Sequence, residues 1–235
     1  WELVIERINS ELANTLGNLV NRTISMSNKY FDGVVTNAGA HEPVDDDLKA
    51  VVTDTRLRVN ACMDKLRVAD AITEIFALFK RCNKYIDETM PWALAKDPEN
   101  ADRLNTVLYN LVESINIGAE LLKSYLPETS AKILAQINGA ERDFDDLATF
   151  GLRENGLKVT DTPEILFARL DLAEVMKKVE ELHPQVTEEA PAREAEADEE
   201  VIDIEPKEEI SFEDFGKMQF QVGEIIACEE VKKSK

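Results

Sequence analysis

Apolar residues recur every three or four positions through the first thirty residues, and this spacing constrains the fold more than any other feature. The face comprises Ile5, Ile8, Leu12, Leu16, Leu19, Met26 and, by its methyl group, Thr23. Such spacing puts one apolar face along an α-helix, as in a helix that packs against others. The run stops before Asp32 and Gly33, which favour a turn. The sequence therefore predicts an amphipathic helix over residues 2–30.

Five further stretches carry helical spacing or helix-stop signals. They predict helices over residues 45–65, 69–89, 100–126, 127–138 and 171–182. The chain has only nine glycines and eight prolines among 235 residues, which also favours helix over sheet. Residues 138–163 are expected to be irregular, and the short apolar run 163–167 is expected to lie back across the bundle. The predicted fold class is all-α, with a helical bundle over residues 1–184.

The composition changes sharply after the bundle. Residues 187–214 carry thirteen acidic and two basic side chains, a net charge of −11, which leaves −9 for the other 207 residues. Rich in Glu, Ala and Pro, residues 185–209 are predicted to be a disordered acidic linker. In residues 210–235, Met218, Phe220 and Val222 alternate with polar residues or glycine and predict a strand. Because one strand makes no sheet, we expect a further module to begin here and to be truncated.

Several classes of function fit this composition poorly. A formal net charge of −20 argues against a nucleic-acid binder that works by bulk attraction to phosphates. No apolar run approaches the length of a membrane span, and we expect no signal peptide. The three cysteines lie far apart and no Cys or His cluster occurs, so we expect reduced thiols and no metal site. No nucleotide-binding, hydrolase or metalloprotease motif is present, and we expect no catalytic centre.

Asn18 and Arg22 are predicted to lie inside the apolar stripe of the first helix. Four residues apart, their side chains leave the same face of the helix one turn apart. An amide beside a guanidinium offers several donors and one acceptor, and such a pair can read the edge of a nucleobase. A polar pair that braces two helices, or one that is simply solvated, is the commoner role for such residues.

Two other candidates could contact nucleic acid. Trp92 follows Pro91 at the predicted end of the helix over residues 69–89, where it would either pack in the core, the commoner role, or offer a face for base stacking. Lys232, Lys233 and Lys235 form a small basic cluster at the end of the chain. By default, such a cluster is a solvated charge run.

Several separated blocks resemble, in order, the helical anticodon-binding domain of bacterial methionyl-tRNA synthetases. The blocks are INSELANTLGNLVNRTISMSNKYFDG (8–33), NKYIDETMPWALAKD (83–97), LNTVLYNLVESINIGAELLKSYLPETSAKI (104–133) and ILFARLD (165–171). The stretch ISFEDFGKMQFQVGEIIACEEVKKSK (210–235) resembles the start of the tRNA-binding OB-fold module at the C-terminus of many of these enzymes. The resemblance covers most of residues 1–183 and implies a bundle of the class Ia synthetase type.

The resemblance implies roles for the candidate residues. Asn18 and Arg22 match the residues that hydrogen-bond the first anticodon base, a cytosine, and Trp92 matches the tryptophan on which that base stacks. Lys232, Lys233 and Lys235 become candidate contacts to the tRNA backbone. The implied partner is methionine tRNA, with no role for DNA or a membrane. The complete C-terminal module would support a homodimer, and the implied location is the cytoplasm.

The sequence departs from the whole enzyme in one major respect. The catalytic domain of the family should precede residue 1, and its signature motifs are absent. The resemblance therefore implies that ATP and Mg²⁺ belong to the full-length enzyme, and that this piece has no cofactor and does not activate methionine. The function implied is recognition of the methionine tRNA anticodon by one part of a ligase.

Three alternatives remain open from the sequence. The bundle could belong to another class I synthetase, it could be a non-catalytic helical scaffold that binds protein, or it could be a free-standing tRNA-binding protein acting in trans. The anticodon hypothesis makes a geometric prediction that the scaffold does not. The helices over residues 2–30 and 69–89 must pack so that their C-terminal halves share one rim, with Arg22 and Trp92 facing one groove.

Overall fold

The first thirty residues form one continuous helical rod whose hydrogen bonding changes in the middle. In the computed structural model, which describes residues 1–182, the rod consists of α1 (Glu2–Arg7), the π-helical segment η1 (Ile8–Gly17) and α2 (Asn18–Phe31). At the end of η1, the backbone N–H of Asn18 donates to the carbonyl of Ala13, five residues back. The helix predicted over residues 2–30 is confirmed, but its π segment was not predicted, because apolar spacing does not reveal which carbonyl each N–H binds.

The rod ends at a turn that requires glycine. Asp32 adopts the left-handed conformation (φ 52°), and Gly33 follows it with a φ of 81°. The N–H of Gly33 donates to the carbonyl of Ser27 at 3.0 Å, which satisfies a carbonyl in the last turn of α2. A Cβ atom on Gly33 would lie 2.5 Å from Oδ1 of Asn28. The turn predicted at Asp32 and Gly33 is therefore confirmed.

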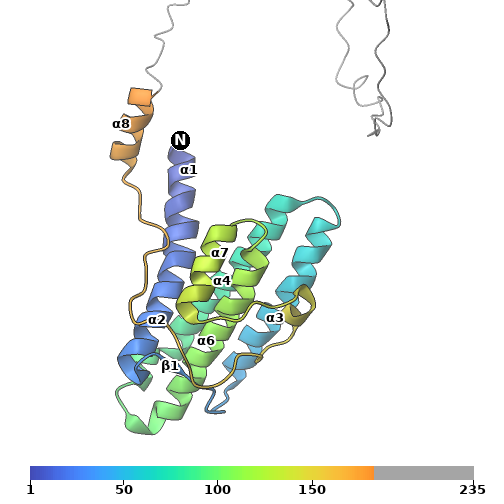
Figure 1. The fold of residues 1–235 in the computed structure, drawn as a ribbon, viewed down its shortest axis with the longest axis vertical. Coiled ribbons are helices and arrows are strands. Elements are labelled where there is room, and N and C mark those ends of the chain that lie inside the picture. Colours follow the sequence, from blue (N-terminus) through green and yellow to red (C-terminus); the bar gives the residue numbers. More distant parts are fainter. Residues whose placement is uncertain (183–235) are drawn as a thin grey trace, which may run out of the picture. The chain divides into compact units, whose positions relative to one another are not determined.

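Four further helices complete the bundle and alternate in direction (Figure 1). They are α3 (Pro43–Met63), α4 (Val68–Thr89), α6 (Ala101–Leu122) and α7 (Pro127–Ile137). The connection between α4 and α6 contains two short elements, α5 (Pro91–Leu94) and the 3-10 turn η2 (Pro98–Asn100). Each of the four helices matches a predicted one to within a few residues, and the all-α fold class is confirmed.

The core is built around α6. Every residue of α6 from Thr106 to Leu122 is buried, because α6 contacts α2, α3, α4 and α7. On α4, the rings of Phe76 and Phe79 meet edge to face with their centroids 5.7 Å apart. Truncating a large core side chain such as Ile115 to alanine costs about 2–5 kcal/mol. The central helix therefore sets the positions of the helices around it, including α2 and α4.

A two-stranded ribbon joins the end of the rod to the later part of the chain. β1 (Val34–Val35) pairs antiparallel with β2 (Leu157–Lys158), with Val34 opposite Lys158 and Val35 opposite Leu157. The 3-10 turn η3 (Phe144–Ala148) precedes β2. The sequence predicted only irregular structure over residues 138–163, since a strand of two residues is too short to show alternation.

The chain then returns along the rod, as predicted for residues 163–167. Asn9 exchanges two hydrogen bonds with the backbone of Leu170, at 2.8 and 2.9 Å. Phe167 and Gly17 line the same groove. The helix predicted over residues 171–182 is present as α8 (Leu172–Leu182).

Some predictions lie outside the described residues. These are the acidic linker over 185–209, the OB-fold start over 210–235 and the basic cluster of Lys232, Lys233 and Lys235. Within residues 1–182, no helix combines the length and apolar character needed to cross a membrane.

Candidate nucleic-acid interface

The polar pair of the first helix lies on the face of α2 that points away from the core. Leu19 and Thr23 are buried, whereas Asn18 and Arg22, each one position earlier, are exposed. Neighbouring residues on an α-helix differ in direction by about 100°, so the core positions of Leu19 and Thr23 turn the pair toward solvent. The prediction that Asn18 and Arg22 lie inside the apolar stripe was therefore wrong, and both polar groups face water.

A groove of about 530 Å³ runs between the rod and the returning segment 165–169. Residues with polar or aromatic side chains that line it are Asn14, Asn18, Asn21, Phe167 and Arg169. Of the three residues predicted to contact the anticodon base, Asn18 lines this groove, and Arg22 and Trp92 do not. Amide and guanidinium groups supply the donors and acceptors that bind base edges, so the groove extends the polar surface around Asn18.

Trp92 lies at the corner between α4 and α6. Met90 adopts a left-handed conformation (φ 44°) that ends α4 and begins α5, and Pro91 is buried at the first position of α5. Trp92 comes next and is 43% exposed. Trp92 is therefore not packed in the core, although core packing is the commoner role for a tryptophan at such a position. A half-exposed indole offers a flat apolar face to which another ring can stack.

Two contacts fix the register between the rod and α4. Lys80 forms an ion pair with Glu11 at 2.9 Å, and Nδ2 of Asn83 donates to the carbonyl of Thr15 at 2.9 Å. From the first contact to the second, the residue numbers rise in both helices, from 11 to 15 in the rod and from 80 to 83 in α4. The two helices are therefore parallel. Seven residues beyond the second contact, Arg22 is level with Met90.

Figure 1 shows the resulting arrangement. The C-terminal ends of α2 and α4 lie at the same end of the bundle, the lower end in the view. Because Trp92 follows Met90 by two residues, it lies within about one helical turn of the level of Arg22 along the bundle axis. The polar pair and the tryptophan are thus brought to the same end of the bundle from positions 70 residues apart in the sequence.

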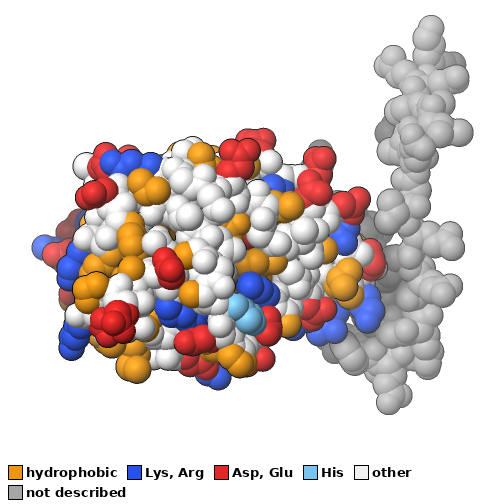
Figure 2. Space-filling view, turned by 90° about the horizontal axis from the view of Figure 1, so that it is seen from below, with side chains coloured by type: hydrophobic (Ala, Val, Ile, Leu, Met, Phe, Trp, Pro, Cys, Tyr) orange, Lys and Arg blue, Asp and Glu red, His pale blue; other side chains and the backbone are white. Residues whose placement is uncertain are grey.

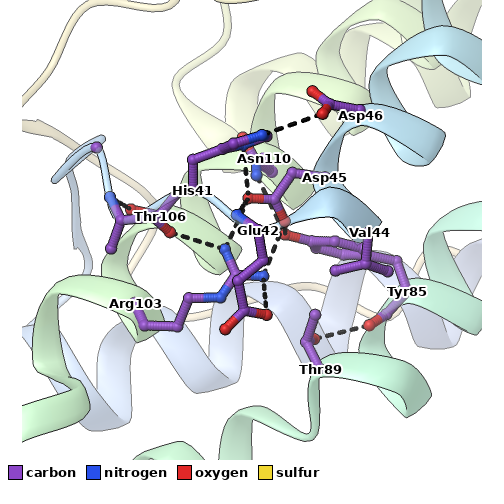
Figure 3. Close-up of polar contacts among 12 residues, drawn as sticks. His41, Glu42, Val44, Asp45, Asp46, Tyr85, Thr89, Arg103, Thr106 and Asn110 are labelled. Carbon is purple, nitrogen blue, oxygen red and sulfur yellow. Dashed lines mark hydrogen bonds and ion pairs between the residues drawn. The ribbon is translucent and has the colours of Figure 1, made fainter.

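A buried polar network joins three helices at this end of the bundle (Figure 3). The Asp45 carboxylate of α3 accepts two hydrogen bonds from the Arg103 guanidinium of α6, at 2.7 and 2.8 Å. It also accepts one from the Tyr85 hydroxyl of α4 at 2.6 Å, and Asn110 donates to that hydroxyl oxygen at 3.1 Å. Each member binds a partner on another helix, which ties the start of α3 and the start of α6 to the end of α4.

The network holds a true ion pair at neutral pH. Burial acts to raise the pKa of Asp45, but hydrogen bonds from Arg103 and Tyr85 outweigh it and hold that pKa below the usual value. Burial acts to lower the pKa of Arg103, and the Asp45 carboxylate reverses the effect and raises it. Burial, followed by the hydrogen bond to Asp45, raises the pKa of Tyr85, so its hydroxyl keeps the proton that it donates.

The last turn of α4 connects the buried network to the segment that carries Trp92. Oγ1 of Thr89 donates to the carbonyl of Tyr85 at 2.7 Å, and Met90 and Pro91 follow directly. In the sequence, Asp45 is one of three consecutive aspartates at the start of a predicted helix, a position that also suits a solvated residue near the helix dipole, and its buried pairing was not predicted. A signal existed in α6, where Arg103 and Asn110 have the same seven-residue spacing as buried apolar residues.

The surface at this end of the bundle is mixed in charge. Figure 2 views the molecule from below and shows acidic and basic side chains interspersed, with broad uncharged areas between them. Neither the acidic nor the basic side chains form a continuous patch on the face shown. This face therefore offers no basic patch of the kind that attracts the phosphates of a nucleic acid in bulk.

Other residues singled out in the sequence have structural explanations. Cys82 is buried, and burial raises the pKa of its thiol to about 12. Cys62, near the end of α3, is a free thiol and is partly buried. In the part of the chain that the structure describes, no three His, Cys, Asp or Glu side chains gather closely enough to hold a metal ion.

Solved structures share this fold. The apo methionyl-tRNA synthetase of Mycobacterium tuberculosis superposes with a TM-score of 0.67 at 32% identity, over 72% of this chain and 34% of that one. The same enzyme bound to methionyl-adenylate gives a TM-score of 0.66 at 32% identity, over 71% and 33% of the two chains.

Comparisons of sequence agree with the structural ones. Methionine–tRNA ligases of Clostridium perfringens and Clostridium tetani are 41% and 43% identical to all of this chain, which spans 35% and 34% of their lengths. The ligase of Bacillus subtilis is 36% identical over 98% of the chain and 34% of its own length. The family model described as the anticodon binding domain of methionyl tRNA ligase matches residues 35–183. The chain therefore belongs to the family of methionyl-tRNA ligase anticodon-binding domains.

Proposed function

We propose that this chain recognises the anticodon of methionine tRNA as one part of a methionine–tRNA ligase. The observation that carries the proposal is the register between the rod and α4, which brings exposed Arg22 level with the corner that presents Trp92. On this proposal, a planar base that stacks on the indole receives its edge contacts from donors on α2. Stacking and edge contacts together are the usual means by which proteins read single-stranded RNA loops.

Each residue has a role that its chemistry supports. The Watson–Crick edge of cytosine carries one amino donor beside two acceptors. Arg22 supplies only donors and suits the acceptors, and Oδ1 of Asn18 suits the amino group. Trp92 stacks on the face of the base, an interaction worth about 1–3 kcal/mol.

The remainder of the ligase belongs to the same proposal. The chain spans about a third of the curated relatives that it matches, so we assign methionine activation, with ATP and Mg²⁺, to a catalytic domain outside it. On this proposal the isolated chain does not aminoacylate tRNA. The module begun by residues 210–235 would support a homodimer when complete, and Lys232, Lys233 and Lys235 would contact the tRNA backbone. The ligase would act in the cytoplasm, without contact to DNA or a membrane.

A titration with an anticodon stem-loop tests the proposal. Fluorescence anisotropy would compare a labelled stem-loop of methionine tRNA with one whose first anticodon base is changed from cytosine to uracil. Hydrogen bonds to a charged group are worth about 1.5–3 kcal/mol, so Arg22→Gln should weaken binding of the cytosine form by about ten- to a hundredfold. The preference for cytosine over uracil should shrink in Asn18→Ala.

Arg67→Gln is the matched control, because Arg67 is an exposed arginine at the α3–α4 turn, at the opposite end of the bundle. The Arg67→Gln variant should bind the cytosine stem-loop with the affinity of the unchanged chain. A helical scaffold for protein binding predicts no dependence on the anticodon at all. Equal affinities for the two stem-loops would therefore refute the proposal and favour the scaffold.

A further inference from the structure

The groove beside Asn18 lies between two points at which the returning chain is attached to the rod (Figure 1). At one end, Asn9 exchanges two hydrogen bonds with the backbone of Leu170, at 2.8 and 2.9 Å. At the other end, Nδ2 of Asn28 donates to the carbonyl of Thr160 at 2.9 Å. The rod rises about 28 Å between its two attachment points, and ten residues of extended chain reach at most about 33–36 Å. The returning chain is therefore nearly taut, which fixes the groove as a permanent gap.

The asparagines inside the groove are not used for attachment. Asn14 and Asn18 line it and are exposed, and within residues 1–182 neither side chain hydrogen-bonds another protein group. Asn21, the third asparagine of the groove, is half-buried and accepts one hydrogen bond from Oγ of Ser25 at 3.4 Å. An amide offers both a donor and an acceptor, so it can bind the edge of a ligand that carries both. The groove thus holds free amides where the neighbouring asparagines of the rod use theirs for structure.

The electrostatics of the groove differ from those of the chain as a whole. In the described part of the chain, no acidic side chain lines the groove, and the exposed Arg169 lies on its wall. Residues 12–31 of the rod contain two basic residues and no acidic one, although 47 of the 235 residues of the chain are Asp or Glu. Glu164 and Asp171 flank the returning segment but do not line the groove. A polyanion that enters the groove therefore meets no carboxylate on its walls.

One part of the groove is apolar. A Cβ atom on Gly17 would lie 3.9 Å from Cδ2 of Phe167, so the half-buried ring lies against the bare backbone of the rod. Gly17 is also the last residue of the π segment, and such segments are frequent at functional sites. An apolar surface beside free amides is the combination with which proteins hold a single-stranded nucleobase.

Asn18 belongs both to this groove and to the proposed anticodon site. Asn14 lies about one helical turn before it, so a strand that continues from Asn18 into the groove would pass Asn14. A volume of about 530 Å³ lies in the range of sites for small planar ligands. In a single-stranded loop, the nucleotide next to the one at Asn18 would enter the groove.

We infer that the groove binds the base next to the cytosine in the anticodon, which is an adenine because the anticodon CAU reads the methionine codon AUG. The Asn14 amide accepts from the 6-amino group of adenine and donates to a ring nitrogen, a pairing that asparagine makes with this base. Arg169 contacts the phosphate of the same nucleotide. The inference rests on the proposed function, because it takes the anticodon loop as the ligand.

A titration with an altered base tests the contact to Asn14. Fluorescence anisotropy of the full chain would compare the methionine stem-loop with one in which purine, which lacks the 6-amino group, replaces this adenine. The unchanged chain should bind the purine form about two- to tenfold more weakly. Asn14→Ala should weaken the adenine form by a similar factor and abolish the difference between the two forms. Asn60→Ala, which changes an exposed asparagine in the last turn of α3, should keep that difference.

The outcomes separate the groove from the proposed function. Asn14→Ala should keep the preference for cytosine over uracil at the first anticodon base, which the proposed function assigns to α2. If the unchanged chain binds the adenine and purine forms equally, or if Asn14→Ala keeps their full difference, the groove inference is overturned while the cytosine preference can still hold. If the unchanged chain has no cytosine preference, the proposed function fails, and the groove inference fails with it.

The phosphate contact has a different signature. Arg169→Gln should weaken the adenine and purine forms by the same factor, about two- to fivefold, because a phosphate carries no information on the base. It should also reduce the dependence of log affinity on log salt concentration by about 0.7, the value for one phosphate of a single strand. Arg67→Gln should leave both quantities unchanged. An unaltered salt dependence in Arg169→Gln would overturn the assignment of Arg169.

Discussion

Replacing Asp45 by alanine would test whether the buried ion pair holds the corner that carries Trp92. The carboxylate is completely buried and accepts hydrogen bonds from Arg103 and Tyr85. Its loss strands a buried guanidinium, and breaking a buried pair from one side costs about 3–5 kcal/mol. Half-exposed Glu42 remains 3.2 Å from Arg103 and offsets part of the loss. We therefore expect the free energy of unfolding to fall by about 3 kcal/mol, the low end of that range.

Urea unfolding of the full chain, followed by far-UV circular dichroism, would measure this loss. Arg103→Met should cost a similar amount, because it leaves the Asp45 carboxylate unpaired. The double variant should lose less than the sum of the two, with a coupling energy of about 1–3 kcal/mol, since no unpaired charge remains. The Asp45–Arg103 pair would behave like a solvated surface ion pair if the two losses of unfolding free energy were additive, or if Asp45→Ala lost less than about 1 kcal/mol. Either result would refute the structural role assigned to the pair.

The pH dependence of stability gives a separate check on Asp45. Its pKa in the folded chain lies below the usual value because Arg103 and Tyr85 stabilise the carboxylate. A group of this kind contributes its full stability above the unfolded pKa of about 3.9 and loses it as the pH falls through the folded pKa. The unchanged chain should therefore lose stability more steeply than Asp45→Ala below about pH 4. Parallel curves in that window would contradict the assigned direction.

Three further predictions concern single side chains. Trp92→Ala should weaken binding of the methionine anticodon stem-loop by about 1–3 kcal/mol, with Trp92→Phe closer to the unchanged chain, and equal affinities of the folded variants would exclude stacking. Gly118→Ala should lower stability to urea by about 1–3 kcal/mol, because a Cβ there would lie 2.4 Å from Cε1 of Phe79; an unchanged midpoint would mean that α4 can shift to accept it. Cys82 should resist alkylation in mildly alkaline solution while Cys62 reacts, since burial raises the Cys82 pKa to about 12. Peptide mass spectrometry after alkylation of the folded chain would measure both rates, and faster labelling of Cys82 than of Cys62 would contradict the prediction.

The helices were predictable because their signal is repeated many times along the chain. In α4, residues such as Ile75, Phe79 and Cys82 recur at helical spacing and are all buried. By contrast, the β1–β2 ribbon contains two residue pairs, too few for alternation to be visible. The π segment was also unpredictable, because its distinction lies in the backbone hydrogen bonds of residues 8–17 and not in which side chains are apolar.

The buried polar groups were harder to predict for an electrostatic reason. Asp45 in a first helical turn fits a solvated residue near the helix dipole as well as a buried partner, and only the approach of Arg103 from α6 decides between them. The sequence separates these two residues by 58 positions, and charge type alone does not pair them. Arg153 illustrates the converse, since its burial follows from the packing of irregular segments that carry no periodic signal.

The proposed anticodon site depends on register more than on any single side chain. Asn18 and Arg22 on an exposed helix face are indistinguishable in sequence from an ordinary solvated face. What brings Arg22 level with Met90 is the pairing of Thr15 with Asn83 and of Glu11 with Lys80, contacts made about two and three turns earlier along the rod. Each residue of slip between the rod and α4 would move Trp92 by about 1.5 Å relative to Arg22. Since a stacked base is only one ring thick, the register contacts of η1 fix the geometry of the site although none of them touches it.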